Sequence, residues 1–208
     1  GVARGDLRML FTDWGRFRRY VQCMCIGLPI WFVAGIMVNF APETARGLGV
    51  TGRIVAGDAV AIYYTGLILG DFGSGILSQL LHSRRQAVAL ALGGTVLGIL
   101  AYAFWPGLTA RGVYALCFLL GVSTGYWAVF VTMASEHFGT NLRATVTTTV
   151  PNFVRGALPL MLLVYAPLRE AAGVLTGVLL VGGAVLALAF GALWGLPETH
   201  GRDLDFVE

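Results

Sequence analysis

Charged residues are scarce in this sequence, and lysine is absent. Only 12% of the 208 residues are charged, whereas 57% are hydrophobic. A soluble domain of this length does not have such a balance. The hydrophobic residues also lie in long runs with little polar sequence between them, so the composition excludes a soluble globular protein and indicates one whose solvent is lipid.

Residues that form disulfides or bind metals are also few. Cys23 and Cys25 lie two positions apart, about 200° around a helix, so they do not face one metal together. The glycines of residues 70–73 lie inside an apolar run and not after a strand, which excludes a phosphate-binding loop. All three histidines lie outside the apolar runs, at spacings unsuited to a metal, namely His82, His137 and His200. The sequence therefore predicts no metal, no cofactor and no enzyme.

Six apolar runs are each long enough to cross the hydrocarbon core as a helix, which takes about 20 residues. They cover residues 20–41, 55–81, 87–105, 112–134, 144–166 and 171–196. The predicted fold is an all-α polytopic membrane bundle. A lead-in of residues 1–19 precedes the bundle of residues 20–196, and a tail of residues 197–208 follows it.

The arginines predict the orientation of the bundle. Nine fall on one side of the membrane, namely Arg4, Arg8, Arg16, Arg18, Arg19, Arg84, Arg85, Arg143 and Arg202. Four fall on the other side, namely Arg46, Arg53, Arg111 and Arg169. The positive-inside rule then places both termini in the cytoplasm. The protein is expected to be a multi-pass protein of the plasma membrane, which in a bacterium is the inner membrane. Because the arginines are spread over loops, they do not indicate a nucleic-acid partner.

The lead-in and the first loop differ in pattern. Apolar residues recur at helical spacing in the lead-in, which favours a helix lying in the membrane interface, with a disordered linker as the alternative. These residues are Leu7, Leu10, Phe11, Trp14 and Phe17. Residues 42–54 begin with a proline and contain three glycines, which is typical of a loop.

Two ionisable residues lie deep inside predicted spans. Asp71 is ten residues before the cytoplasmic end of the second span, and Arg155 is eleven residues after the cytoplasmic start of the fifth. At about 1.5 Å per residue, both lie about 15 Å from the same face of the membrane. A charge at this depth is costly unless it is paired or hydrated. We expect a shared water-filled cavity, with a purely structural ion pair as the alternative.

The fifth span carries a polar stripe beside Arg155. Helical spacing places four residues on one face, namely Thr145, Thr148, Asn152 and Arg155. We interpret this face as a cavity wall, with helix bends at Pro151 and Pro159. The alternative is that the threonine hydroxyls bond back to their own helix. Two deep tryptophans are candidates for stacking on a solute, with helix packing as the alternative, namely Trp31 and Trp127.

The six spans divide into two triplets, residues 20–105 and 112–196. Because each triplet has an odd number of spans, the second enters the membrane from the opposite side, as in the inverted repeats of secondary transporters. Glycines also recur at a spacing of four, which lets helices approach closely. The pairs are Gly66 and Gly70, Gly94 and Gly98, Gly121 and Gly125, Gly173 and Gly177, and Gly191 and Gly195.

Three segments resemble motifs of the major facilitator superfamily. Residues 197–202, Pro-Glu-Thr-His-Gly-Arg, resemble the PETKGR signature that closes many of its members, notably sugar porters. Residues 136–143 are similar to its E-x-F-P-x-x-x-R loop, and Gly75 with residues 83–85 is similar to its G-x-x-x-D-R-x-G-R-R loop. The resemblance covers all six spans and implies the C-terminal half of a twelve-helix transporter whose N-terminal six-helix half is a partner.

The resemblance also implies roles for residues. The motif positions would form a cytoplasmic gate of charges, namely Arg84, Arg85, Glu136, Arg143, Glu198 and Arg202. Solvated loop charges are the alternative. Sugar porters carry a Gln-Gln pair on the first span of this half, where this chain has only Gln22. The threonine-rich fifth span is similar to that of transporters of metabolites or organic anions.

Together these observations predict a secondary transporter that moves a small polar solute by alternating access, either an organic anion or metabolite or a sugar-like molecule. Arg155 would anchor the solute, and Asp71 would be its partner or would couple transport to protons. Asn152, Thr148, Trp127 and Trp31 complete the expected site. Two other hypotheses remain open: a membrane sensor or scaffold that transports nothing, and a half-size transporter that dimerises.

Overall fold

The computed structural model describes residues 5–208, so Arg4 and the rest of residues 1–4 lie outside the described residues. The described chain is helical and contains no strand. Six helices are long and apolar enough to cross a membrane, which confirms the predicted all-helical fold of a multi-pass membrane protein. These candidate spans are Trp14–Val38, Ala56–Leu80, Arg84–Phe104, Ala110–Glu136, Thr140–Ala172 and Val174–Gly195.

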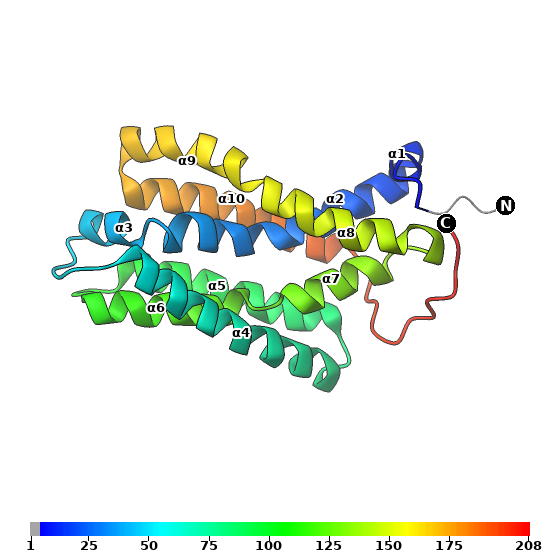
Figure 1. Ribbon diagram of the computed structural model, residues 1–208, viewed down its shortest axis with the longest axis horizontal. Coiled ribbons are helices and arrows are strands. Elements are labelled where there is room, and N and C mark those ends of the chain that lie inside the picture. The colour runs from blue at the N-terminus through cyan, green and yellow to red at the C-terminus, as the bar shows by residue number, and fades with distance from the viewer. Residues whose placement is uncertain (1–4) are drawn as a thin grey trace.

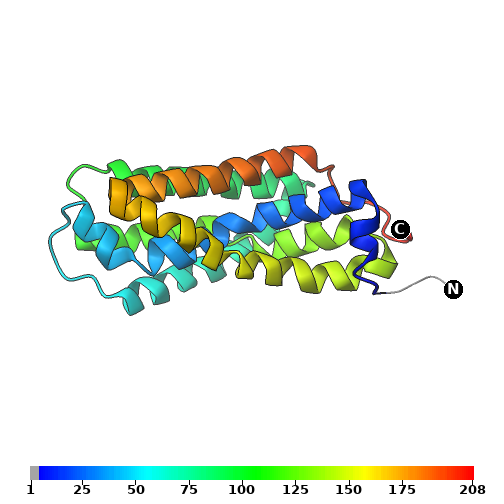
Figure 2. The same cartoon turned by 90° about the horizontal axis from the view of Figure 1, so that it is seen from above.

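The spans consist of shorter elements. In chain order, the elements are α1 (Met9–Thr12), α2 (Trp14–Phe32), the π-helix η1 (Val33–Val38), α3 (Ala41–Gly47), α4 (Ala56–Leu80), α5 (Arg84–Phe104), α6 (Ala110–Thr124), α7 (Trp127–Glu136), α8 (Thr140–Gly156), α9 (Leu158–Ala172) and α10 (Val174–Gly195). Figures 1 and 2 show an elongated bundle with its helices running along the long axis. The element α1 and the tail of residues 197–208 lie at one end, here called the tail end.

The predicted interface helix of the lead-in is divided in two. Asp13 has an extended backbone between α1 and α2, and its carboxylate accepts a hydrogen bond from the Arg16 backbone N–H at 2.8 Å. Such a residue caps the start of a new helix. The first span therefore begins at Trp14, earlier than the predicted residue 20.

The first loop is shorter than predicted. Residues 42–54 were expected to be a loop, but α3 occupies Ala41–Gly47. Pro42 lies in the first turn of α3, where a missing N–H costs no hydrogen bond, so proline here starts a helix and does not mark a loop. Only the glycine-containing part after α3 lacks helical structure.

Three spans are interrupted in their interior. The first changes from α-helix to π-helix at Val33, four residues after Pro29. The fourth stops at Thr124 and starts again at Trp127. The fifth breaks at Ala157, because Pro159 has no N–H to donate to the carbonyl four residues before it. Of the two predicted bends, only the one near Pro159 interrupts the helix, and Pro151 lies within α8.

The tightest packing joins α4 and α6, which cross through the predicted glycine pairs. A Cβ atom at Gly66 would overlap the Phe118 carbonyl, and one at Gly121 would overlap the Tyr63 carbonyl. Gly70 and Gly125 contact each other's backbones at this crossing. Not every predicted pair works this way, since a Cβ at Gly191 would meet nothing within 4 Å. The helix α2 packs against α10 and α8 and so occupies a central position (Figure 1).

Candidate functional site

A cavity of about 260 Å³ lies at the level of the span interruptions. We call it the mid-span pocket. It contains four of the six residues predicted to bind or couple the solute, brought from four different spans. Its lining residues are Ile30, Trp31, Ala34, Tyr63, Tyr64, Leu67, Asp71, Trp127 and Arg155.

Arg155 is held from two sides. Its guanidinium lies over the Trp31 ring, with 5.5 Å between Cζ and the ring centroid. Its Nη1 donates a hydrogen bond to Asn152 Oδ1 at 3.2 Å, and Asn152 Nδ2 donates to the Thr148 carbonyl at 2.9 Å. The predicted residues Asn152 and Thr148 therefore position Arg155 and do not line the pocket themselves.

The threonine hydroxyls of α8 bond back to their own helix. Thr148 donates to the Ala144 carbonyl at 2.9 Å, and Thr149 donates to the Thr145 carbonyl at 2.8 Å. This is the pattern of the alternative interpretation of the polar stripe. Thr148, Asn152 and Arg155 are nevertheless exposed on one face of the fifth span, which has the lowest mean hydropathy of the six. Polar groups exposed at membrane depth face a water-filled cavity or another protein segment, because lipid does not satisfy them.

Asp71 bonds to the interrupted fourth span. Its Oδ1 accepts a hydrogen bond from the Ala128 backbone N–H at 3.1 Å, at the start of α7. A carboxylate is favourable there because the first N–H groups of a helix have no partner within the helix. Within residues 5–208, neither Asp71 nor Arg155 takes part in an ion pair, so the structural pair that the sequence left open does not form.

Four of the nine residues that line the pocket are aromatic, and two of these, Tyr63 and Tyr64, were not predicted from the sequence. Tyr63 is fully buried, and its hydroxyl shares a hydrogen bond of 2.8 Å with Thr124 Oγ1 at the end of α6. Helical spacing was the available signal. Tyr63, Leu67 and Asp71 follow one another at intervals of four residues, so they lie on one face of α4.

At the tail end, predicted gate residues meet in a second polar site. Arg84 Nη2 lies 3.4 Å from Glu136 Oε1, and these side chains are only 14% and 11% exposed. Arg84 Nη1 also donates to Ser78 Oγ at 2.8 Å, and Thr199 Oγ1 donates to Glu136 Oε2 at 2.6 Å. Arg84 and Glu136 are therefore not the solvated loop charges of the alternative.

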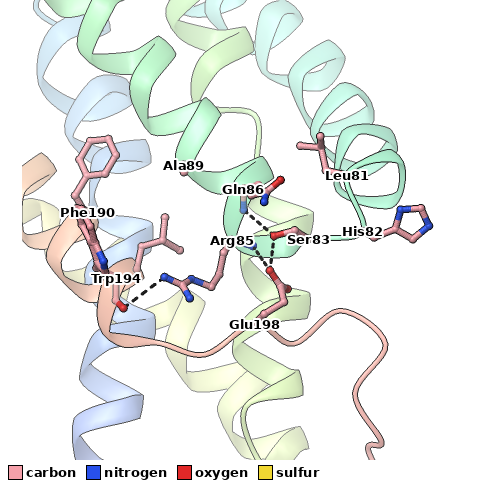
Figure 3. A pocket seen from close by; sticks show the side chains of 10 residues that line it. Leu81, His82, Ser83, Arg85, Gln86, Ala89, Phe190, Trp194 and Glu198 are labelled. Atoms are coloured by element: carbon pink, nitrogen blue, oxygen red, sulfur yellow. Dashed lines mark hydrogen bonds between the residues drawn. The ribbon is translucent and has the colours of Figure 1, made fainter.

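Glu198 binds the start of α5 (Figure 3). Its carboxylate accepts hydrogen bonds from the Ser83 hydroxyl and from the backbone N–H groups of Arg84 at 2.9 Å and Arg85 at 3.2 Å. Burial by itself raises the pKa of Glu198, but these hydrogen bonds, with those from Thr199 and His200, outweigh burial and lower the pKa to about 2. Glu198 thus joins the tail to α5 as a carboxylate.

The other three predicted gate residues bond to different groups. Arg143 Nη2 donates to the Leu204 carbonyl at 2.6 Å, and the Arg202 guanidinium lies 5.5 Å from the Phe206 ring centroid. Arg85 Nη2 lies 3.5 Å from the Trp194 carbonyl, beside a cavity of about 690 Å³ between α5 and the end of α10 (Figure 3). The six residues share one end of the bundle, but only Arg84, Glu136 and Glu198 form one network.

Glu208 forms a further contact that the sequence analysis missed. Its carboxylate lies 2.9 Å from Arg19 and 3.7 Å from Arg16 on α2, and its backbone N–H donates to Asn141 Oδ1 at 3.0 Å. Arg19 also donates to the His137 carbonyl at 3.0 Å. Since these residues come from distant parts of the sequence, no local pattern links them. The tail therefore ties together the ends of α2, α5, α7 and α8.

No protein-family profile matches this chain, and neither a curated protein nor a solved structure shows significant similarity to it.

Proposed function

We propose that this chain is the C-terminal half of a major-facilitator-type secondary transporter, which moves a small polar solute through the mid-span pocket by alternating access. Its six spans would form a 3+3 inverted repeat, and an N-terminal six-helix half would face the exposed polar side of α8. The tail end would lie in the cytoplasm, as the arginine distribution predicts.

One observation carries this proposal. The opposite charges of Asp71 and Arg155 line one pocket at membrane depth without pairing with each other. Ionisable residues are costly there, and they mark solute or ion pathways when they are retained. The hydrogen bond to the start of α7 is a structural reason for Asp71, but it gives no reason for an arginine beside the same cavity.

The interrupted spans support the same proposal. The interruption at η1 lies in the first span of the first triplet, and the one between α6 and α7 lies in the first span of the second triplet. These two spans correspond to each other in the proposed repeat. Transporters form their solute sites at such paired interruptions. Trp31 and Ala34 from the first span and Trp127 from the fourth line the pocket.

In this proposal, the network of Arg84, Glu136 and Glu198 is the cytoplasmic gate. It joins α5, α7 and the tail through partly buried charges, and such contacts separate as units when helices rearrange. The pocket and the network lie at different depths of the bundle, so opening the network would give the pocket access to the cytoplasm.

Uptake by proteoliposomes containing the full natural protein tests the proposal. A panel of labelled carboxylates, amino acids and sugars is presented under an imposed pH gradient. We expect saturable uptake of one class, and Arg155→Ala should abolish it. The matched control is Arg169→Ala, because Arg169 also lies over an aromatic ring, that of Phe40 at 5.9 Å, but outside the pocket. Uptake that Arg155→Ala leaves unchanged would overturn the anchor role, and a lack of uptake for the whole panel would favour the sensor hypothesis.

A further inference from the structure

The mid-span pocket carries one positive and one negative group that do not neutralise each other. Asp71 lies on α4 and Arg155 on α8, and both line the pocket. No ion pair within residues 5–208 includes either residue. Two unpaired opposite charges in one small cavity are complementary to a ligand that carries both charges.

Each charge is held by a neutral neighbour. The Ala128 N–H fixes Asp71, while Asn152 and the Trp31 ring fix Arg155. Because these partners are neutral groups, neither residue is neutralised by a neighbouring side chain of the opposite charge. A planar guanidinium is well suited to a carboxylate, and a carboxylate is suited to an ammonium group.

The rest of the pocket wall is apolar and aromatic. Trp31, Tyr63, Tyr64 and Trp127 line it, with Ile30, Ala34 and Leu67. The hydrogen bond between Tyr63 and Thr124 fixes one of these rings. Such a wall contacts a flat apolar group, and aromatic faces also attract an ammonium group.

Ligands with a single charge fit less well. A monocarboxylate bound to Arg155 would lie in the same cavity as the Asp71 carboxylate, and a lone amine would share it with the Arg155 guanidinium. A sugar would leave both charges without a counter-charge and would place its hydroxyls against aromatic carbon.

We propose that the mid-span pocket binds a zwitterionic solute with a flat apolar side group, of the chemical class of the aromatic amino acids. Arg155 binds its carboxylate and Asp71 binds its ammonium group. This inference rests on the proposed transport function and specifies the substrate class of the same site.

Three probes with one shared phenyl group test the inference: L-phenylalanine carries both charges, 3-phenylpropionate only the carboxylate, and 2-phenylethylamine only the ammonium. Binding to the full natural protein is measured by scintillation proximity with labelled probes. We expect L-phenylalanine to bind at least about tenfold more tightly than either analogue, the order expected for one charge-assisted hydrogen bond.

Two variants assign the ends of the ligand. Asp71→Asn should weaken the binding of L-phenylalanine about tenfold or more without weakening that of 3-phenylpropionate. Arg155→Gln should likewise weaken the binding of L-phenylalanine about tenfold or more, without weakening that of 2-phenylethylamine. The matched controls are Asp58→Asn, exposed on the same helix as Asp71, and Arg169→Gln, and neither residue lines the pocket. Both should bind L-phenylalanine like the unaltered protein.

The outcomes separate the inference from the proposed function. Tight binding of 3-phenylpropionate that Asp71→Asn does not change would overturn the zwitterion and leave an organic-anion transporter. Failure of all three probes to bind, beside saturable uptake of another solute, would also overturn the zwitterion while transport stands. If the unaltered protein takes up no solute of the panel, the result would instead contradict the proposed transport function.

Discussion

The Asp71 carboxylate on α4 accepts a hydrogen bond of 3.1 Å from the backbone N–H of Ala128, 57 residues later in the chain. It therefore caps the second half of the interrupted fourth span. Asp71 also lines the mid-span pocket, so the residue that caps α7 is at the same time part of the cavity wall. Its structural and proposed functional roles are linked through one side chain.

Removing this cap should destabilise the fold. We expect Asp71→Ala to lower the free energy of unfolding by about 1 kcal/mol, the usual cost of losing a helix cap. Asp58→Ala, on an exposed position of the same helix, should cost much less. Unfolding by titration with SDS compares the two variants. Equal losses would show that the Ala128 contact contributes nothing.

Loss of one gate charge should open the tail end. Because Glu136 bonds to both Arg84 and Thr199, Glu136→Gln should increase the reaction of cysteines introduced at the tail end with a soluble thiol reagent. The control is Glu43→Gln, whose exposed pair with Arg46 at 3.9 Å lies in α3, away from the tail. An unchanged labelling pattern in Glu136→Gln would argue against a gate.

Acid should weaken the contact between the tail and α5. The pKa of Glu198 is lowered to about 2 from an ordinary value of 4.5, so its stabilisation is complete above pH 4.5 and is lost as the pH falls toward 2. The melting temperature should therefore fall between pH 4.5 and pH 2, and Glu198→Gln should show a smaller fall from a lower starting value. A parallel pH profile in the variant would assign the effect to other groups.

The crossing of α4 and α6 should not tolerate a methyl group. At Gly121 a Cβ would overlap the Tyr63 carbonyl, so Gly121→Ala should destabilise the bundle by about 1–3 kcal/mol. Gly73→Ala is the control, because a Cβ there meets nothing within 4 Å. Thermal unfolding in detergent measures both. A stable Gly121→Ala protein would contradict the close approach.

Single cysteines test the orientation. After Cys23, Cys25 and Cys117 are replaced with alanine, Asp203→Cys should be protected from an impermeant reagent added outside intact cells, whereas Thr51→Cys should react. Both positions are exposed. A cysteine at Ser83, in the connection between α4 and α5, would be a poor alternative for labelling. Ser83 is only 7% exposed and donates a hydrogen bond to Glu198. The reverse pattern would invert the proposed topology.

The sequence by itself determined the class of fold. Runs of about 20 apolar residues give helices in lipid, because each helix satisfies its own backbone hydrogen bonds, and this rule needs no tertiary information. The depths of Asp71 and Arg155 also followed from counting residues along two helices. Helix ends were less accessible, since the start of the first span depends on the local cap at Asp13.

Only the tertiary structure decided which groups meet. Asp71 and Arg155 line one pocket, but each has its own hydrogen-bond partner, Ala128 and Asn152. The contact between Glu208 and Arg19 joins the tail to α2. Periodicity within a helix predicts its faces, but the pairing of faces from different helices depends on close packing across the whole bundle.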